Sequence, residues 1–350
     1  MDIHTAQFLD LKIISVKQET PHAKTYQLEA CHATPLQYKP GQFLTFIIHT
    51  GKQELRRSYS ILSLPGEPLR ITVKKVDNGA ISRYILQYWK EGITVTSLYP
   101  AGRFTIDPQA QKKRDIFCFA AGSGIIPILP QIRNLLAKEH QSIIHLVYSN
   151  HNEQDTLFLS EIEELTTQYH QLTTTFYFSE PFSRHHEQGH LSNISAEALV
   201  KRKLRFKKED AVFLLCGPFT YMRMLRITLG FMHFNQNQIL RENYVPESMR
   251  SGMVHHPVYP PRSVSLKIHH DVLPVKVESG QDILTAALRQ GINLPYSCRG
   301  GVCGNCAALC KQGKIYMSIN EVLTENDLKQ GWVLTCTGYP EEDHTVLEFL

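Results

Sequence analysis

The stretch that decides the fold is Ser297-Cys298-Arg299-Gly300-Gly301-Val302-Cys303-Gly304-Asn305-Cys306, close to the end of a chain of 350 residues. Its cysteines have the spacing C-x4-C-x2-C, and a fourth cysteine follows later in Leu334-Thr335-Cys336. This pattern predicts the four thiolate ligands of a [2Fe-2S] cluster, which are Cys298, Cys303, Cys306 and Cys336. Three ligands on one tight loop require the backbone to pass close to the inorganic sulfides. The loop glycines give the chain that freedom, and they are Gly300, Gly301 and Gly304.

A zinc site or inert thiols could also account for these cysteines. Zinc sites often contain a C-x2-C pair, but they usually place it opposite a second closely spaced pair, and Cys336 stands alone. Disulfides are disfavoured in a long chain without a secretion signal. Cys310 lies outside the ligand spacing and is interpreted as a buried spectator. The cluster is therefore the favoured hypothesis, and zinc and inert thiols stay open as alternatives.

The composition is that of a globular protein with two or three domains. Hydrophobic residues make up 42% of the chain, and the formal net charge is +4. So small a charge disfavours nucleic acid as a partner, and the Lys and Arg residues at 201–208 are interpreted as a solvated helix end. Residues 1–10 lack the pattern of a signal peptide, and no apolar stretch has the length of a membrane span. We therefore expect a cytoplasmic protein without a membrane span.

The chain divides into three predicted domains and a linker. Residues 1–107 contain short alternating apolar runs between Pro and Gly turns, which is typical of a small antiparallel β-barrel. Residues 108–245 alternate apolar strands with helices, which predicts a doubly wound parallel α/β domain. Residues 246–261 are rich in Pro, His, Ser and Gly and are predicted to be a linker. The cluster-bearing residues 262–350 follow as an α+β domain, for which we expect a β-grasp fold.

A four-residue motif ends a predicted barrel strand, directly before an apolar run: Arg57, Ser58, Tyr59 and Ser60. It resembles the R-x-Y-S motif of the ferredoxin-NADP reductase superfamily, which binds flavin. The resemblance implies that Tyr59 lies against the isoalloxazine ring, that Arg57 pairs with the flavin phosphate and that Ser60 hydrogen-bonds near N5. An arginine fork suits a phosphate, and an aromatic face suits a flat ring. For so short a motif, an ordinary edge strand is the alternative.

Two further stretches follow in the order of the same family. Thr72-Val73-Lys74 matches the strand after the flavin motif. Gly79-Ala80-Ile81-Ser82 matches a G-x-x-S turn, in which a helix N-terminus offers backbone N–H groups to a pyrophosphate. This second phosphate contact favours FAD, although some reductases with the same modules bind FMN.

The α/β domain carries two candidate nicotinamide-binding turns. Gly122-Ser123-Gly124 follows an apolar strand and opens a helix, as a phosphate-binding turn requires. Pro127 stands where the third glycine of the dinucleotide fingerprint would be, a departure that is typical of the family. Cys216-Gly217-Pro218 resembles the family's C-G-P motif, whose cysteine lies beside the nicotinamide C4. Glu242 and Tyr244 match acidic and aromatic positions near the flavin. A plain strand-to-helix turn and a buried cysteine are the alternatives.

The choice between NADH and NADPH depends on the loop that contains Ser149 and His151, where members of this family bind the adenosine ribose. An arginine often occupies the position of His151 when the 2′-phosphate of NADP is recognised. A histidine that is mostly neutral at pH 7 is a poorer phosphate ligand than a guanidinium. His151 as an ordinary surface residue is the alternative, so the nucleotide is written NAD(P)H.

The whole chain resembles oxygenase reductases with a C-terminal ferredoxin domain, above all those of the phenylacetyl-CoA epoxidase type. The resemblance implies an NAD(P)H-dependent oxidoreductase that passes electrons through FAD and a [2Fe-2S] cluster to a partner oxygenase. A flavin is needed because a hydride carries two electrons and the cluster accepts one at a time. The residues expected around the reacting rings are Tyr59, Ser60 and Cys216. Alternatives are a fatty-acid desaturase or hybrid-cluster protein as acceptor, and a redox-sensing module without turnover.

Overall fold

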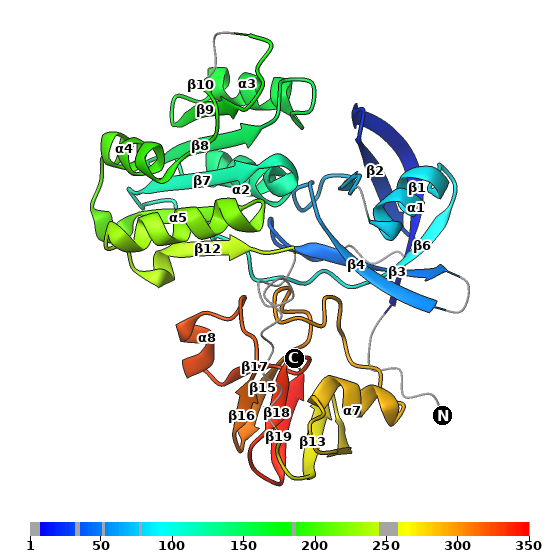
Figure 1. Cartoon of the computed structure of the whole chain (residues 1–350). Helices are drawn as coiled ribbons and strands as arrows, with labels where there is room; N and C mark the ends of the chain where they lie inside the picture. The colour runs from blue at the N-terminus through cyan, green and yellow to red at the C-terminus, as the bar shows by residue number, and fades with distance from the viewer. Residues whose placement is uncertain are drawn as a thin grey trace.

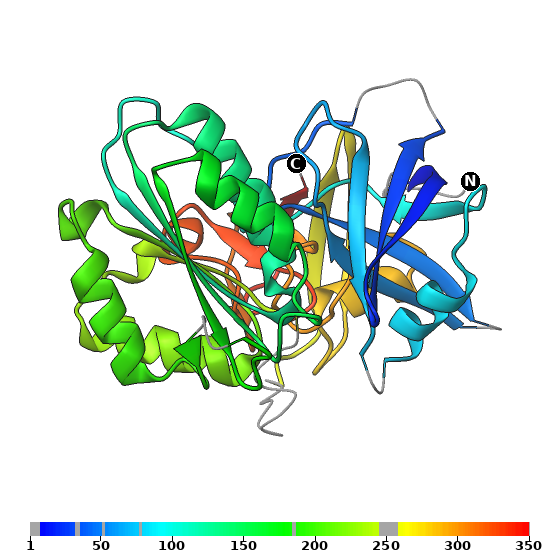
Figure 2. The same ribbon diagram turned by 90° about the horizontal axis from the view of Figure 1, so that it is seen from above.

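The computed structural model describes residues 8–31, 36–50, 53–76, 79–183, 187–244 and 258–349. They form three bodies with separate main sheets, coloured blue to cyan, green, and yellow to red in Figure 1. The third body contacts both others, through a hydrogen bond between Ser58 and Ser297 and one from Asn243 to Glu321. Figure 2 shows the three bodies from above. Residues 246–257 of the predicted linker lie outside the described residues.

The first body is an antiparallel sheet of six strands in the order β4-β3-β6-β1-β2-β5. A bridge between Ile61 and Ile71 brings the end of β4 against β5, so the sheet closes on itself as the predicted barrel. Leu9, Leu11 and Ile13 alternate with exposed residues along β1, because one face of each strand lines the barrel core. The elements are β1 (Phe8–Thr20), β2 (Ala23–Ala30), β3 (Phe43–Thr50), β4 (Gln53–Ser60), β5 (Leu69–Lys74), α1 (Ala80–Tyr88) and β6 (Thr94–Leu98).

The second body is a parallel sheet in the order β10-β9-β8-β7-β11-β12. Helices α2 and α3 cover one face, and α4 and α5 cover the other. Every residue of the central strand β7 is buried, as expected for a strand covered on both faces. Its elements are β7 (Asp115–Ala121), η1 (Gly122–Gly124), α2 (Ile125–Lys138), β8 (Ile143–Asn150), α3 (Leu159–Gln168), β9 (Leu172–Phe178), β10 (Glu187–Gln188), α4 (Asn193–Lys203), η2 (Lys208–Asp210), β11 (Val212–Cys216), α5 (Phe219–Phe231), η3 (Gln236–Gln238) and β12 (Ile239–Glu242).

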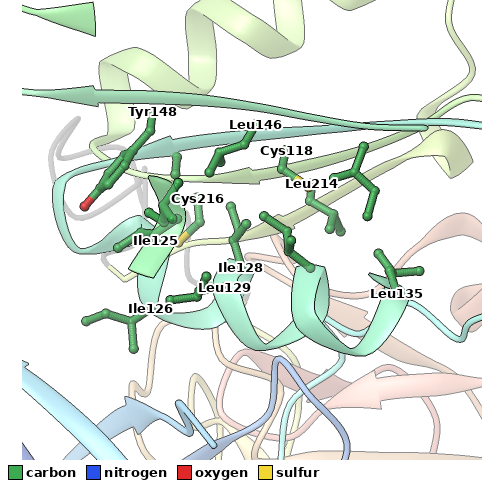
Figure 3. Packing of buried hydrophobic residues seen from close by; sticks show 14 of the residues in the cluster. Cys118, Ile125, Ile126, Ile128, Leu129, Leu135, Leu146, Tyr148, Leu214 and Cys216 are labelled. Atoms are coloured by element: carbon green, nitrogen blue, oxygen red, sulfur yellow. The ribbon is translucent and has the colours of Figure 1, made fainter. Parts of the chain in front are cut away.

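Apolar packing fixes α2 over this sheet, and with it the turn that precedes the helix. Ile128 and Leu129 of α2 point toward Leu146, Leu214 and Cys216 of the strands (Figure 3). The carboxyl ends of β7, β8 and β11 therefore meet the start of α2 at one edge of the sheet, the edge at which doubly wound folds bind their ligands.

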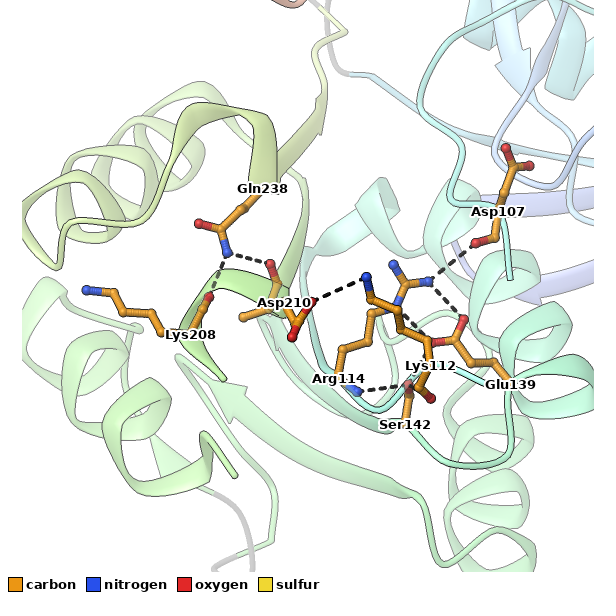
Figure 4. Close-up of polar contacts among 9 residues, drawn as sticks. Asp107, Lys112, Arg114, Glu139, Ser142, Lys208, Asp210 and Gln238 are labelled. Carbon is orange, nitrogen blue, oxygen red and sulfur yellow. Dashed lines mark hydrogen bonds and ion pairs between the residues drawn. The ribbon is translucent and has the colours of Figure 1, made fainter. Parts of the chain in front are cut away.

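A buried ion pair stabilises the other end of this domain, where β7 begins (Figure 4). The guanidinium of Arg114 donates from Nε and Nη2 to the carboxylate of Glu139, each at 2.8 Å, and Ser142 donates to the same carboxylate. The Glu139 side chain is fully buried and that of Arg114 nearly so. Lys112 and Asp210 form a second, more exposed pair at 3.3 Å.

The third body is a mixed sheet in the order β14-β13-β19-β15-β17, in which β13 and β19 run parallel and α7 packs on one side. This is the predicted β-grasp arrangement. A small second sheet pairs β16 with β18. The elements are β13 (Arg262–Ile268), β14 (Asp271–Val277), α7 (Ile283–Arg289), β15 (Ala307–Gln312), β16 (Ile315–Met317), α8 (Glu325–Lys329), β17 (Trp332–Leu334), β18 (Gly338–Pro340) and β19 (Thr345–Phe349).

The predicted fold class is thus confirmed for all three bodies, whereas the domain boundaries at residues 107, 245 and 261 stay predictions. Lys201, Arg202 and Lys203 form the last turn of α4, in agreement with the interpretation as a helix end.

Candidate functional site

The end of β4 carries the predicted flavin motif, and successive side chains point to opposite faces of the strand. Arg57 and Tyr59 share one face. Arg57 is exposed, and its Nη1 donates to the carbonyl oxygen of Arg56 at 2.8 Å. Tyr59 is half-buried, and burial raises the pKa of its hydroxyl. An exposed guanidinium beside an aromatic ring fits a ligand that is both anionic and flat.

Ser58 and Ser60 point to the other face of β4. Ser60 is buried and lies within hydrogen-bonding reach of Tyr244. The Ser58 hydroxyl is hydrogen-bonded to the Thr45 hydroxyl at 2.9 Å and to that of Ser297 at 2.8 Å. Ser58 therefore faces the cluster domain, an orientation that the flavin motif alone did not indicate.

The side chains of the second predicted flavin stretch alternate between the two faces of β5. Val73 is fully buried in the barrel core, whereas the hydroxyl of Thr72, on the other face, is hydrogen-bonded to that of Thr25 at 2.8 Å. Lys74 lies on the same face as Thr72, and its Nζ would lie 3.8 Å from a Cβ placed on Gly122. Of these three side chains, Lys74 alone reaches the edge where the two domains meet.

Helix α1 begins as the G-x-x-S pattern predicts. Gly79 is its N-cap and provides no side-chain cap, and the first turn contains no acidic residue. Ala80 is exposed, whereas Ile81 and Ser82 are buried. The Ser82 hydroxyl accepts from the N–H of Val76 at 3.1 Å. A helix start without a side-chain cap is suited to bind phosphate oxygens.

The two predicted nicotinamide turns meet because β7 and β11 are neighbours, with Cys216 in register with Ala120. A Cβ on Gly124 would lie 2.0 Å from the carbonyl oxygen of Cys216, so only glycine permits this approach. Cys216 is fully buried, which raises the pKa of its thiol. Gly217 follows, and Pro218 is the N-cap of α5.

A cavity of about 590 Å³ lies between the barrel and the nucleotide domain. Residues from several predicted stretches line it, namely Lys74, Gly122, Ser149, His151 and Pro218. The sequence did not indicate some further lining residues, among them His22, Asp155, His190 and Thr220. Asn150 Nδ2 is buried without a hydrogen-bond partner among the described residues, so a polar ligand in the cavity would satisfy it. The cavity therefore fits a dinucleotide.

Tyr244 joins the barrel to the nucleotide domain. Its hydroxyl donates to the carbonyl oxygen of Ser123 at 3.3 Å and lies within reach of Ser60 and Cys216. Glu242 is in register with Cys216 on the neighbouring strand, and burial raises the pKa of its carboxyl to about 8. The structure thus brings together Ser60 and Cys216, two of the residues expected around the reacting rings.

Both ring nitrogens of His151 have partners. Nδ1 lies 3.0 Å from Oγ of Ser179, and Nε2 lies 3.2 Å from a carboxylate oxygen of Glu180. Glu180 follows the end of β9, so only the parallel pairing of β8 with β9 reveals this contact. A carboxylate beside His151 repels a phosphate and accepts hydrogen bonds from a ribose hydroxyl.

The four cysteines of the predicted ligand set lie together. Cys298 hydrogen-bonds to Cys303 and to Cys336, and Cys306 hydrogen-bonds to Cys336. These contacts lower the pKa of Cys298 and Cys306, and they raise the pKa of Cys303 and Cys336. The N–H and hydroxyl of Thr335 donate to the Cys306 carbonyl oxygen at 3.2 and 3.0 Å, which holds Cys336 beside the loop.

The cluster loop has three residues in the left-handed region. Gly301 and Gly304 both have φ of 73°, and the third is Arg299 at 52° rather than the expected Gly300. Gly300 instead donates its N–H to Sγ of Cys298 at 3.4 Å. Hydrogen bonds to sulfur are among the factors that set the potential of an iron–sulfur cluster.

In the part of the chain that the structure describes, no group of three or more His, Cys, Asp or Glu is arranged to hold a single metal ion. A [2Fe-2S] cluster makes a different demand, because its four thiolates are divided between two irons. The mutual contacts of the thiols and the N–H donor to sulfur fit such a cluster. Cys310 is half-buried rather than buried, and its thiol donates to the carbonyl oxygen of Gln312.

None of the helices in the described ranges has the length and apolar character needed to cross a membrane.

Three family models match the chain in the order of its three bodies. They are the oxidoreductase FAD-binding domain over residues 10–106, the oxidoreductase NAD-binding domain over residues 119–226 and the 2Fe-2S iron-sulfur cluster binding domain over residues 268–341. The cofactors FAD, NAD(P)H and [2Fe-2S] therefore agree with those predicted.

Whole-length relatives show the same arrangement. The chain is 31% identical to a subunit of the 1,2-phenylacetyl-CoA epoxidase of Escherichia coli strain K12, over 98% of both chains. It is 29% identical to the ferredoxin reductase component of 3-ketosteroid-9-alpha-monooxygenase from Mycobacterium tuberculosis strain H37Rv, over 96% of this chain and 94% of the relative. Among solved structures, phthalate dioxygenase reductase shares the fold with a TM-score of 0.60 and 22% identity over 98% of both chains. The chain therefore belongs to the family of NAD(P)H-dependent oxygenase reductases that combine a flavin barrel, a nucleotide domain and a C-terminal [2Fe-2S] domain.

Proposed function

We propose that this protein transfers electrons from NAD(P)H through FAD and a [2Fe-2S] cluster to a partner oxygenase. The observation that carries the proposal is the convergence of the three candidate sites. Tyr244 joins Ser60 to the Cys216 region of the nucleotide domain, and Ser58 joins the same strand to Ser297, the residue before Cys298. These contacts support a path on which the proposed donor, flavin and cluster sites would follow one another.

The chain's own residues bind and orient each group. Arg57 and the start of α1 would hold the flavin phosphates, and Tyr59 would lie against the ring. Gly124 and Cys216 would admit the nicotinamide beside it, with the rest of the dinucleotide in the cavity lined by Ser149 and others. When bound, FAD supplies the chemistry that accepts a hydride and releases electrons singly.

Cys298, Cys303, Cys306 and Cys336 would hold the cluster, since soft thiolates are the ligands that iron–sulfur clusters use. The N–H of Gly300 would stabilise the charge on the Cys298 sulfur. Free thiols persist in reducing compartments, so we also infer a cytoplasmic location.

The acceptor is inferred from the relatives. The E. coli relative is named as a subunit of an epoxidase, and the M. tuberculosis relative as the ferredoxin reductase component of a monooxygenase. The favoured acceptor of this chain is therefore an oxygenase component of the phenylacetyl-CoA epoxidase type. A desaturase or a hybrid-cluster protein would use the same internal electron path.

Anaerobic titration tests the proposal. Protein loaded with its cofactors should show flavin and cluster absorbance, and both should bleach when NADH or NADPH is added. Bleaching of neither, or of the flavin alone, would reject electron transfer through the chain. Reduced protein should then be mixed anaerobically with purified candidate oxygenase components. Its flavin and cluster absorbance should return rapidly only with the physiological acceptor.

A further inference from the structure

Strand β4 separates the two predicted cofactor sites. Arg57 and Tyr59 point to the face where the flavin is expected, and Arg56 and Ser58 point to the face that contacts the cluster domain. Arg56 directly precedes the flavin motif, and the motif itself gives it no role. Its side chain is 4% exposed, which is unusual for an arginine.

The buried guanidinium of Arg56 has only part of its hydrogen bonds within the barrel. Nε donates to Glu54 at 2.7 Å, but Nη1 is buried without a hydrogen-bond partner among the described residues. What covers the guanidinium is the ring of Tyr296, whose centroid lies 3.9 Å from Cζ of Arg56. A buried cation needs compensation, and here the Glu54 carboxylate pairs with one side of the guanidinium while the ring face of Tyr296 covers it.

Tyr296 is equally tied to the cluster loop. The guanidinium of Arg299 lies 4.5 Å from the same ring, and Arg299 directly follows the ligand Cys298. Ser297, the next residue after Tyr296, accepts or donates the hydrogen bond to Ser58. Tyr296 and Ser297 are adjacent in the loop, and they contact Arg56 and Ser58, which point to the same face of β4. These two contacts together fix the position of the loop along the strand.

A third contact lies on the neighbouring strand. Thr45 of β3 pairs in register with Ser58, and its hydroxyl accepts from Nδ2 of Asn305 at 3.4 Å. Asn305 lies between the ligands Cys303 and Cys306. The β3–β4 hairpin therefore contacts the loop at two places, directly before Cys298 and between Cys303 and Cys306.

We propose that Arg56 and Tyr296 form an interdomain latch that holds the cluster loop against the flavin strand, which makes Arg56 a positioning residue for electron transfer inside the chain. The effect of the latch on electron transfer rests on the proposed function, whereas the latch itself is a contact between two side chains. Loss of either partner leaves flavin and nucleotide sites intact and lets the loop move away from β4.

The test compares four single variants of the full-length holoprotein and the double variant that combines Arg56→Met with Tyr296→Leu. Arg56→Met and Tyr296→Leu remove the cation–π contact, and Tyr296→Phe keeps the ring face. Arg289→Met removes an exposed arginine at the end of α7 and is the matched control for lost charge.

Hydrogen–deuterium exchange is the first readout and does not depend on turnover. Arg56→Met and Tyr296→Leu should each raise exchange in peptides from residues 296–306 and 43–58, whereas Tyr296→Phe and Arg289→Met should match the wild type. Anaerobic stopped-flow is the second readout. In the two disrupting variants, flavin bleaching by the nucleotide should stay within about twofold, and cluster bleaching should slow at least about tenfold. The double variant should be no slower than either single one, because both changes remove the same contact.

Unchanged exchange together with unchanged cluster bleaching in Arg56→Met and Tyr296→Leu would overturn the latch. Equal defects in Tyr296→Phe and Tyr296→Leu would also overturn it, because the ring face would then have no role. If Arg56→Met loses its flavin, the comparison of Tyr296→Leu with Tyr296→Phe tests the latch, since these variants leave the barrel unaltered. A wild type whose flavin does not bleach would instead contradict the proposed function. The exchange data would then still test whether the latch exists.

Discussion

The hydroxyl oxygens of Ser58 and Ser297 lie 2.8 Å apart, although 239 positions separate the two residues in the chain. Ser58 belongs to the predicted flavin motif, and Ser297 directly precedes the first predicted cluster ligand. The contact means that the loop around Cys298 lies next to the strand that carries Tyr59. Electron transfer between the two sites therefore does not require a large rearrangement of the described residues.

Replacing one cluster ligand should separate the two halves of the activity. In Cys303→Ser, a hydroxyl replaces the thiolate, and we expect loss of the cluster and of cytochrome c reduction. Nucleotide-dependent ferricyanide reduction should be retained within about twofold, because the flavin and nucleotide sites lie in the other two bodies. Cys310→Ser is the control, since its thiol lies outside the ligand set and should leave iron content unchanged. Simultaneous loss of both activities would show that the modules are not separable.

A side chain at Gly124 should block the nicotinamide site. A Cβ there would lie 2.0 Å from the carbonyl oxygen of Cys216, and the backbone of η1 and of the buried strand β11 cannot yield easily. We expect Gly124→Val to retain FAD and cluster absorbance while flavin reduction by NADH or NADPH slows about 100-fold or more. Gly230→Ala is the control, because nothing lies within 4 Å of the added Cβ. Normal reduction kinetics in Gly124→Val would place the nicotinamide elsewhere.

The sequence predicted those parts of the site that depend on local pattern. The cysteine spacing and the glycine turns follow from short stretches of sequence with a direct physical meaning. What it missed are contacts between distant segments. In the sequence, Arg56 only precedes the flavin motif and Tyr296 only precedes the cysteine loop, so neither position indicates a contact. The two side chains meet because the cluster domain packs on β4.

Side-chain direction was also beyond the sequence. Thr72 and Val73 match the family strand, but Val73 points into the barrel core and the Thr72 hydroxyl is buried against Thr25, so of the three residues Lys74 lines the cavity. Glu180 was missed for a related reason, since its contact with His151 depends on the neighbouring positions of β8 and β9. Local pattern identifies the element, whereas packing decides which of its residues face a ligand.

The buried pair of Arg114 and Glu139 should contribute to the stability of the nucleotide domain toward acid (Figure 4). Burial alone would raise the pKa of Glu139, but hydrogen bonds from Arg114 and Ser142 hold it below its ordinary value of 4.5. A carboxyl whose pKa is lower in the folded state stabilises the fold above the unfolded value, and this contribution is lost as the pH falls below about 4.5. Glu139→Gln should lower the free energy of unfolding at pH 7 by about 3–5 kcal/mol, because it leaves the Arg114 cation buried and unpaired.

Urea denaturation followed by circular dichroism between pH 3 and pH 7 would measure this effect. Glu197→Gln, which removes an exposed pair with Lys201, should change the free energy of unfolding by no more than about 0.5 kcal/mol. A loss in Glu139→Gln as small as that of the control would contradict a stabilising role for the buried pair.

The contact between Glu180 and His151 should make the protein favour NADH over NADPH. Glu180 Oε2 lies 3.2 Å from the imidazole, at the loop where the adenosine ribose is expected, and its negative charge would repel a 2′-phosphate. The side chain is 74% exposed, so solvent screens the repulsion and a modest effect is expected.

Glu180→Gln should raise kcat/KM for NADPH relative to NADH about threefold, and Glu180→Arg should raise it at least about tenfold because the guanidinium can bind the phosphate. Steady-state ferricyanide reduction with both nucleotides measures the ratio, with the exposed helical substitution Glu164→Gln as the control. If both Glu180 variants keep the wild-type ratio, the carboxylate does not contact the ribose region and selectivity must come from other residues of the cavity.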